Sequence, residues 1–311
     1  MSVSKKKLIF IKLYDTLTTD NKPAFKDWAT LIFLMLVWGS SFIFVKRGLD
    51  VFSHLQVGGL RISLSFIVLI PFAIKRIKRV DKKDIKFFIL VGLLGNGIPA
   101  FMFAKAQTGL DSYMAGILNS LTPLFTLVVG ILFFGVRTRW FNVAGVIIGL
   151  IGAIGLLWSS SGGDISLNLF YSLAVIIATI CYALNMNIVK RFLRKYDAVT
   201  ITSVAFIFIG VPAIVFILAF TDFISRMETG TDAWISLGYV GILSFVGTSL
   251  AVILLNKLIK RTSAVFASSV TYLMPIIAIL WGVLDGEIFL AVFSVWIAVI
   301  LGGVYMANRR G

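Results

Sequence analysis

Long apolar runs alternate with short polar or charged breaks along nearly the whole chain. About 20 mostly apolar residues are needed for a helix to cross a bilayer. Runs of about that length predict spans at residues 27–45, 55–74, 85–106, 111–134, 139–158, 168–189, 198–220, 233–256, 263–284 and 287–307. The breaks at 135–138 and 285–286 are short enough to predict tight hairpins. The pattern therefore predicts an all-α integral membrane protein with ten transmembrane helices.

Composition supports a lipid environment. Hydrophobic residues make up 59% of the 311 residues, charged residues make up 14%, and the mean hydropathy is +0.99. A soluble domain carries about 25% charged and 45–50% apolar residues. A single core stops growing near this length, so it could not bury so much apolar surface.

The positive charges lie in clusters between the apolar runs. With the N-terminus on the cytoplasmic side, the cytoplasmic segments and adjoining span ends hold 24 of the 29 Lys and Arg residues. Four lie on the other side, and Arg61 alone lies within a span. This bias predicts cytoplasmic termini. Clusters placed in this way favour the lipid bilayer as a partner and argue against nucleic acid, despite the net charge of +15.

The two halves of the chain resemble each other. Residues 38–47 (WGSSFIFVKR) align without gaps on 182–191 (YALNMNIVKR), and residues 112–134 align on 264–286. Five spans in each half is an odd number, so the second half must enter the membrane from the opposite side. The predicted organisation is a cytoplasmic tail at 1–26, a first repeat at 27–158 and an inverted second repeat at 168–308.

A stripe of small and polar residues follows one helical face in the fourth span and again in its repeat. Each stripe contains a proline, Pro123 or Pro275, which removes the backbone hydrogen bond to the carbonyl four residues earlier. Those carbonyls belong to Asn119 and Thr271. A freed carbonyl at mid-membrane is costly unless it faces a cavity or a partner. One interpretation is a shared central site with proline gating, and the other is close helix packing alone.

Polar and aromatic residues on matched faces extend this candidate site. The predicted substrate-binding residues are Trp38, Ser41, Asn96, Asn119, Tyr182, Asn185, Thr248 and Thr271. Arg61 is either paired structurally or in contact with substrate. Asp111 and Glu287, at span ends, are candidates for a charge role.

Catalysis is not expected. The 14 acidic residues lie in the tail, in loops or at span ends, and the single histidine, His54, lies in a predicted loop. Without a second His or a nearby Cys there is no metal-binding pattern, and Cys181 is the only cysteine. The sequence predicts no catalytic residue, no metal and no cofactor.

With these motifs laid out, the chain resembles the EamA-type transporters of the drug/metabolite transporter superfamily over residues 27–308. The residues that carry the resemblance are Trp38-Gly39-Ser40-Ser41-Phe42, Arg61, Leu121-Thr122-Pro123-Leu124-Phe125, Leu273-Met274-Pro275 and Gly286-Glu287. The first half departs from the last pair, with Gly135-Val136. The resemblance implies ten helices in two inverted halves around a central cavity, and outward movement of small metabolites across a bacterial inner membrane.

These observations predict a secondary transporter, an exporter of small organic metabolites such as amino acids, working by alternating access. One alternative is a broad-specificity efflux pump for drugs or lipophilic cations. The small multidrug pumps use a Glu in the first span, and residues 28–45 hold no carboxylate. A non-transporting membrane enzyme or sensor is a further alternative. The sequence does not fix the substrate, the direction, the coupling ion or the oligomeric state, and a monomer is compatible with it.

Overall fold

The computed structural model describes residues 23–136, 139–160, 165–228, 230–272 and 274–308. Most of the predicted tail at 1–26 therefore lies outside the described residues. Every regular element in the described part is helical. The elements are α2 (Phe25–Leu49), α3 (His54–Ile77), η1 (Lys82–Asp84), α4 (Ile85–Gly92), η2 (Leu93–Gly97), α5 (Ile98–Ala106), α6 (Ser112–Asn119), α7 (Thr122–Phe134), α8 (Trp140–Ser160), α9 (Ile165–Phe192), α10 (Ala198–Phe220), α11 (Phe223–Met227), α12 (Thr231–Ser244), η3 (Phe245–Leu250), α13 (Ala251–Arg261), α14 (Ala264–Ser268), η4 (Ser269–Tyr272), α15 (Met274–Leu284) and α16 (Ala291–Asn308).

Within the described residues each predicted apolar stretch is mostly helical, which confirms the all-helical membrane fold. In the described residues, eight helices are long and apolar enough to cross a bilayer. The helices α8 and α16 contribute shorter apolar stretches, Trp140–Leu156 and Ala291–Gly303. The count of ten crossings therefore stays a prediction.

The last helix begins at Ala291, so the predicted start at residue 287 is wrong. Gly286 has a φ of 84° and ends α15 in a left-handed turn. The backbone N–H of Glu287 donates to the Gly282 carbonyl at 2.9 Å, and that of Gly286 donates to Val283 at 3.1 Å. This Schellman motif turns the chain out of the helical path. Glu287 therefore lies in the connection between α15 and α16.

Large apolar side chains cover much of the outer surface. Phe220, Leu284 and Phe133 are 75%, 71% and 72% exposed. A soluble monomer rarely leaves large contiguous apolar patches uncovered, so lipid tails are the environment that fits this surface.

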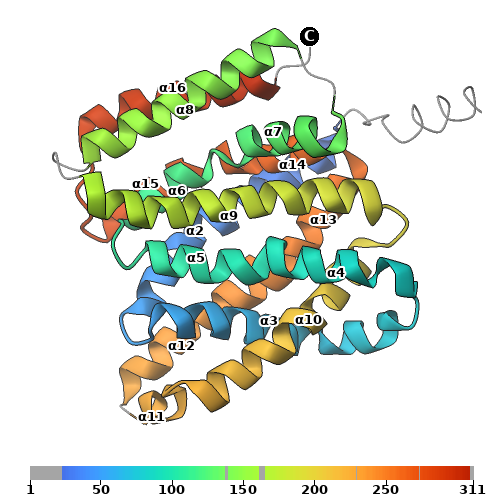
Figure 1. Ribbon diagram of the computed structural model, residues 1–311. Helices are drawn as coiled ribbons and strands as arrows, with labels where there is room; N and C mark the ends of the chain where they lie inside the picture. Colours follow the sequence, from blue (N-terminus) through green and yellow to red (C-terminus); the bar gives the residue numbers. More distant parts are fainter. Residues whose placement is uncertain (1–22, 137–138, 161–164, 229, 273, 309–311) are drawn as a thin grey trace, which may run out of the picture.

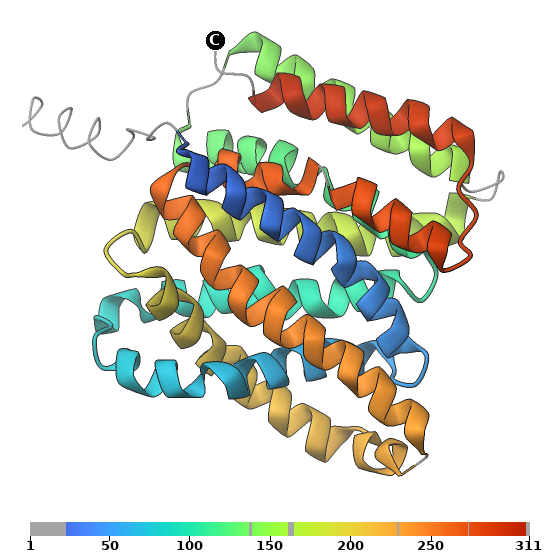
Figure 2. The ribbon, with the colours of Figure 1, turned by 180° about the vertical axis from the view of Figure 1, so that it is seen from behind.

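The helices are stacked in layers. The helices α9 and α5 lie in front in Figure 1, and α2 with the α12–α13 helix lies on the opposite face in Figure 2. The pair α8 and α16 packs together at one edge, and α3 packs with α10 at the other. The broken helices α6–α7 and α14–η4–α15 lie between α8–α16 and the rest.

Among the residues that the structure describes, four helical stretches are interrupted near the centre of the molecule. The segments η2 and η3 are π-helical turns, and they contain Gly95 and Gly247. The other two interruptions lie before α7 and α15, which begin one residue ahead of Pro123 and Pro275. The spacing that relates the two prolines also relates Gly95 to Gly247, so the interruptions occur at equivalent places in the two halves. Extra residues in a π turn loosen the helical hydrogen bonding, which is common at functional sites.

Candidate functional site

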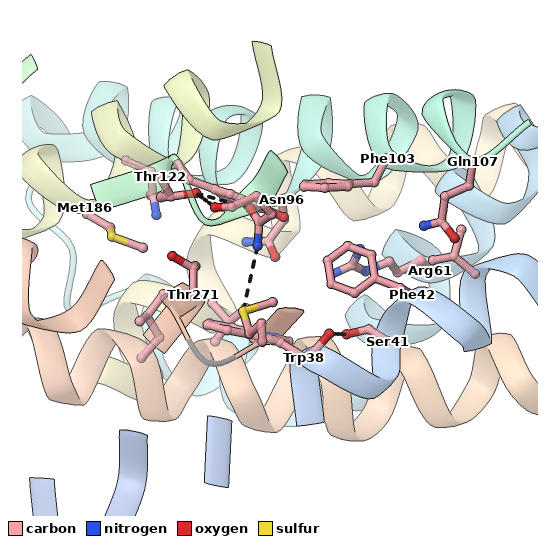
Figure 3. Close-up of a pocket in the computed structure, with 18 residues that line it drawn as sticks. Trp38, Ser41, Phe42, Arg61, Asn96, Phe103, Gln107, Thr122, Met186 and Thr271 are labelled. Atoms are coloured by element: carbon pink, nitrogen blue, oxygen red, sulfur yellow. Dashed lines mark hydrogen bonds between the residues drawn. The ribbon is translucent and has the colours of Figure 1, made fainter. Parts of the chain in front are cut away.

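A central cavity lies between these interruptions. The space not filled by atoms, openings included, is about 710 Å³. Its wall is formed by Trp38, Ser41, Phe42, Val45, Arg61, Gly95, Asn96, Phe103, Gln107, Asn119, Thr122, Tyr182, Asn185, Met186, Val252, Leu255, Thr271 and Met274. Figure 3 shows these side chains converging from helices of both halves.

The structure places most of the predicted site residues on this wall. Those that line the cavity are Trp38, Ser41, Asn96, Asn119, Tyr182, Asn185 and Thr271. The eighth, Thr248, lies behind the lining, and its hydroxyl accepts a 2.8 Å hydrogen bond from Nε of Arg61. The lining thus coincides with the candidate site, while substrate binding by these residues stays a prediction.

Trp38 connects the first half to the π turn η3 of the second. Its indole Nε1 donates to the Gly247 carbonyl at 2.7 Å. This hydrogen bond holds α2 against the π turn η3. The Ser41 hydroxyl, one turn further along α2, donates to the Trp38 carbonyl at 2.8 Å. Both side chains therefore face the cavity while their donors are used within the protein.

The break around Asn119 differs from the sequence-based expectation. The carbonyl that Pro123 frees was expected to be open to substrate, but it accepts a 2.7 Å hydrogen bond from the Thr122 hydroxyl. The Asn119 side chain contacts Thr122 through Oδ1 at 3.2 Å and donates from Nδ2 to the Met274 sulfur at 3.7 Å. A neighbouring hydroxyl satisfies a freed carbonyl more cheaply than exposure to an apolar interior. The freed carbonyl is therefore satisfied from within the first half, while the Asn119 amide reaches Met274 of the second half.

Two amide side chains on the wall have unused hydrogen-bonding atoms. Within the described residues, Oδ1 of Asn185 and both polar atoms of Gln107 are buried and have no hydrogen-bond partner. Asn185 packs directly on the π turn η2, since a Cβ on Gly95 would stand 2.8 Å from Cγ of Asn185. Buried polar atoms without partners are rare and costly, so they indicate a place for a polar ligand.

Aromatic rings form the apolar part of the wall. The ring centroids of Phe42 and Phe103 lie 5.9 Å apart, and those of Phe103 and Tyr182 lie 6.0 Å apart. Sequence analysis missed Phe42, Phe103 and Met186 as lining residues, because apolar residues in spans are too common to stand out. The alternation of Gly95, Asn96 and Gly97 was the available signal for the π turn.

The small-residue stripes serve packing as well as the cavity. A Cβ on Gly116 would stand 2.7 Å from Cβ of Ala278, and one on Gly39 would stand 2.6 Å from Cβ of Ile277. These contacts bring α6 and α2 close to α15. The packing interpretation is therefore right for Gly116 and Ala278, whereas Asn119 and Thr271 face the cavity.

One end of the cavity is closed by a buried carboxylate. Glu287 accepts from Nζ of Lys46 at 2.8 Å, and from the backbone N–H and the hydroxyl of Ser112 at 3.0 Å each. Asp285 pairs with Lys46 at 2.6 Å and also with Arg47. Together they connect the ends of α2, α6 and α15. A second pocket here contains Asp111 and Glu287 and shares Gln107 with the cavity.

The opposite end is held by a different set of contacts. Asp27, at the start of α2, pairs with Arg261, at the end of α13, at 2.9 Å. Lys190 donates to the carbonyls of Thr262 and Ile259, and Arg191 donates to the carbonyl of Phe134 at 2.8 Å. Both ends of the cavity therefore have polar contacts between helices of different halves.

Comparison with known families decides what kind of protein this is. The EamA-like transporter family matches residues 28–158 and again residues 169–309. The chain belongs to this family of membrane transporters.

Several curated proteins that are similar to this chain are named as transporters. The "Uncharacterized inner membrane transporter YedA" of Escherichia coli K12 is 26% identical, over 84% of this chain and 83% of its own. The "Probable amino-acid metabolite efflux pump" of Salmonella typhimurium is 23% identical, over 90% and 94%. The "Probable terminal-alkyne amino-acid exporter" of Streptantibioticus cattleyicolor is 22% identical, over 91% and 93%. A solved structure titled "Crystal structure of protein" shares the fold with a TM-score of 0.65 and 19% identity, over 91% and 96%.

Proposed function

We propose that this transporter exports amino acids or related small metabolites across the inner membrane by alternating access around the central cavity. Relatives that are 22% and 23% identical carry names that refer to export of amino acids or their metabolites, and one 26% identical relative is named as an inner membrane transporter.

The observation that carries the proposal is the composition of the cavity wall. Both halves supply polar side chains and aromatic rings to the wall of a single cavity. The unused amide atoms of Asn185 and Gln107 suit a solute with its own donors and acceptors. The rings of Phe42, Phe103 and Tyr182 suit an apolar portion of the same solute.

The packing of the helices supports ten spans in two inverted repeats. The helix α2 packs on α15, and its repeat equivalent α9 packs on α7. Likewise α5 packs on α9, and its repeat equivalent α13 packs on α2. The pairs α3–α10 and α8–α16 each join equivalent helices. Every one of these contacts is reproduced when the halves are exchanged, as an inverted repeat requires.

Alternating access fits the contacts at the two ends. The cluster of Lys46, Asp285 and Glu287 closes the end where α2 finishes, and the Asp27–Arg261 pair closes the other. If the halves rock about the cavity, the two sets separate in turn. The breaks at Pro123 and Pro275 give the central helices places to bend.

A broad pump for lipophilic cations fits the wall less well. Arg61 is the charged residue among those that line the cavity, and a cationic substrate would be repelled by it.

Counterflow in proteoliposomes tests the proposal. Vesicles loaded with unlabelled L-phenylalanine, L-leucine or L-threonine should take up the same labelled amino acid for at least one of the three. Vesicles tested with tetraphenylphosphonium should show no protein-dependent exchange. Exchange of the cation alone would favour the drug pump. If none of the four compounds is exchanged, the proposal is contradicted. That result is the one expected of a sensor or an enzyme.

A further inference from the structure

We propose that Arg61 binds a carboxylate of the transported solute, so that the substrates are carboxylates with an apolar portion. The inference rests on the proposed function, because it assigns a substrate class to the same cavity. It starts from the charge of the cavity wall. Among the lining residues, Arg61 is the one with a charged side chain.

Arg61 is held in place by two side chains of the second half, Thr248 and Tyr182. Its Nε donates to the Thr248 hydroxyl at 2.8 Å, which fixes the plane of the group. The Tyr182 hydroxyl lies beside it and also interacts with it. The guanidinium carries five N–H donors, and the terminal nitrogens hold four of them. The Nε contact uses one donor and Tyr182 meets the group as well, so further N–H groups remain to pair with a carboxylate.

The positive charge has no ion-pair partner in the part of the chain that the structure describes. An ionic group within a membrane protein is costly unless it is paired or solvated. Thr248 and Tyr182 satisfy individual donors, but neither supplies a negative charge. A carboxylate on the solute would supply that charge.

Other groups on the wall complete a binding arrangement for such a solute. In Figure 3, Arg61, Phe42 and Gln107 lie towards one end of the cavity, and Thr122 and Met186 lie towards the other. The unused amide of Gln107 can donate to the second carboxylate oxygen. The unused Oδ1 of Asn185, beside the π turn η2, can accept from an ammonium or hydroxyl group.

A purely structural role for Arg61 is the competing explanation. In that case Arg61 only connects α3 to η3 through Thr248. Replacing it would then reduce the amount of folded protein without changing which ligands the protein prefers. The ratio of two affinities within one variant separates these explanations, because a smaller folded fraction affects both affinities equally.

The test is equilibrium binding to the purified full chain in detergent, with four named probes. L-phenylalanine and 3-phenylpropionate carry a carboxylate, whereas L-phenylalaninamide and phenethylamine do not. The wild type should bind each acid at least about tenfold more tightly than the amide, as expected for a charge-assisted contact. In Arg61→Gln the ratio of acid to amide affinity should fall to near one, and Arg61→Lys should give an intermediate ratio. Arg79→Gln, which removes an exposed loop cation, should keep the wild-type ratio.

Three results would overturn the assignment. They are equal binding of acid and amide by the wild type, an unchanged ratio in Arg61→Gln, and no binding of any probe. Binding of 3-phenylpropionate and L-phenylalanine without amino-acid counterflow would leave the assignment standing and refute the proposed cargo. Counterflow of an amino acid, together with an unchanged ratio of acid to amide affinity in Arg61→Gln, would support the proposed cargo and refute the role of Arg61.

Discussion

Gly95 shows how a single missing side chain shapes the cavity. Adding a Cβ would place it 2.8 Å from both Cγ and Oδ1 of Asn185, well inside ordinary contact distance. Overpacking of this kind costs about 1–3 kcal/mol. We expect Gly95→Ala to displace Asn185 and to lower transport per folded molecule by about tenfold.

A matched control exists for this substitution. Gly241 in α12 has no atom within 4 Å of an added Cβ among the described neighbours, so Gly241→Ala should transport like the wild type. Counterflow normalised to the amount of folded protein is the measurement. Equal rates for Gly95→Ala and Gly241→Ala would show that the approach of Asn185 to η2 does not matter for transport.

At the same scale, the sequence predicted which polar residues lie together but not how they bond. Asn119 and Thr271 were recognisable because they are polar, lie mid-span and precede a proline. The hydroxyl of Thr122 that satisfies the Asn119 carbonyl was not recognisable, since this depends on a side-chain rotamer within a broken turn. Thr248 was expected on the wall, and it instead supports Arg61 from behind.

Among the elements, the two proline breaks carry a direct prediction. Pro123→Ala and Pro275→Ala restore a backbone donor, so the broken helices should straighten and the cavity wall should shift. We expect folded protein at normal abundance with transport reduced several-fold. Pro212→Ala, at an exposed position inside α10, provides the control because it alters a helix away from the cavity. Similar rates for all three variants would contradict a role for the breaks.

The contact of Lys46 with Glu287 makes a second prediction at this scale. Glu287 is almost fully buried and joins three helix ends. Loss of a partner from a buried ion pair costs about 3–5 kcal/mol, so Glu287→Gln and Lys46→Met should each lower the thermal stability in detergent. The double variant should lose less stability than the two single variants together, because both single substitutions break the same Lys46–Glu287 contact. Additive losses would show that the two residues act independently.

The elements themselves were largely predictable. Apolar runs of the right length located the helices, because lipid requires every backbone group to be satisfied internally. The π turns η2 and η3 were not predicted, since one extra residue in a turn leaves the hydrophobic pattern almost unchanged. The start of α16 was misplaced because Gly286 ends one helix without starting another.

For the molecule as a whole, the charge bias predicts cytoplasmic termini. This orientation can be tested with single cysteines introduced in a Cys181→Ser background. An impermeant thiol reagent added to intact cells should label Glu228→Cys, between α11 and α12. It should label Lys82→Cys, between α3 and α4, only after the membrane is permeabilised. The reverse pattern would mean that the orientation is inverted.

The central claim is that one cavity opens alternately to the two sides of the membrane. Its most direct test is a cysteine at Ser41 on the cavity wall, in the Cys181→Ser background, with an impermeant methanethiosulfonate applied to either face of the membrane. The account predicts labelling from both faces, slowed by transported amino acid. It predicts no labelling of Ser120→Cys, which is fully buried outside the lining. Labelling of Ser41→Cys from one face only, or from neither, would contradict alternating access through this cavity.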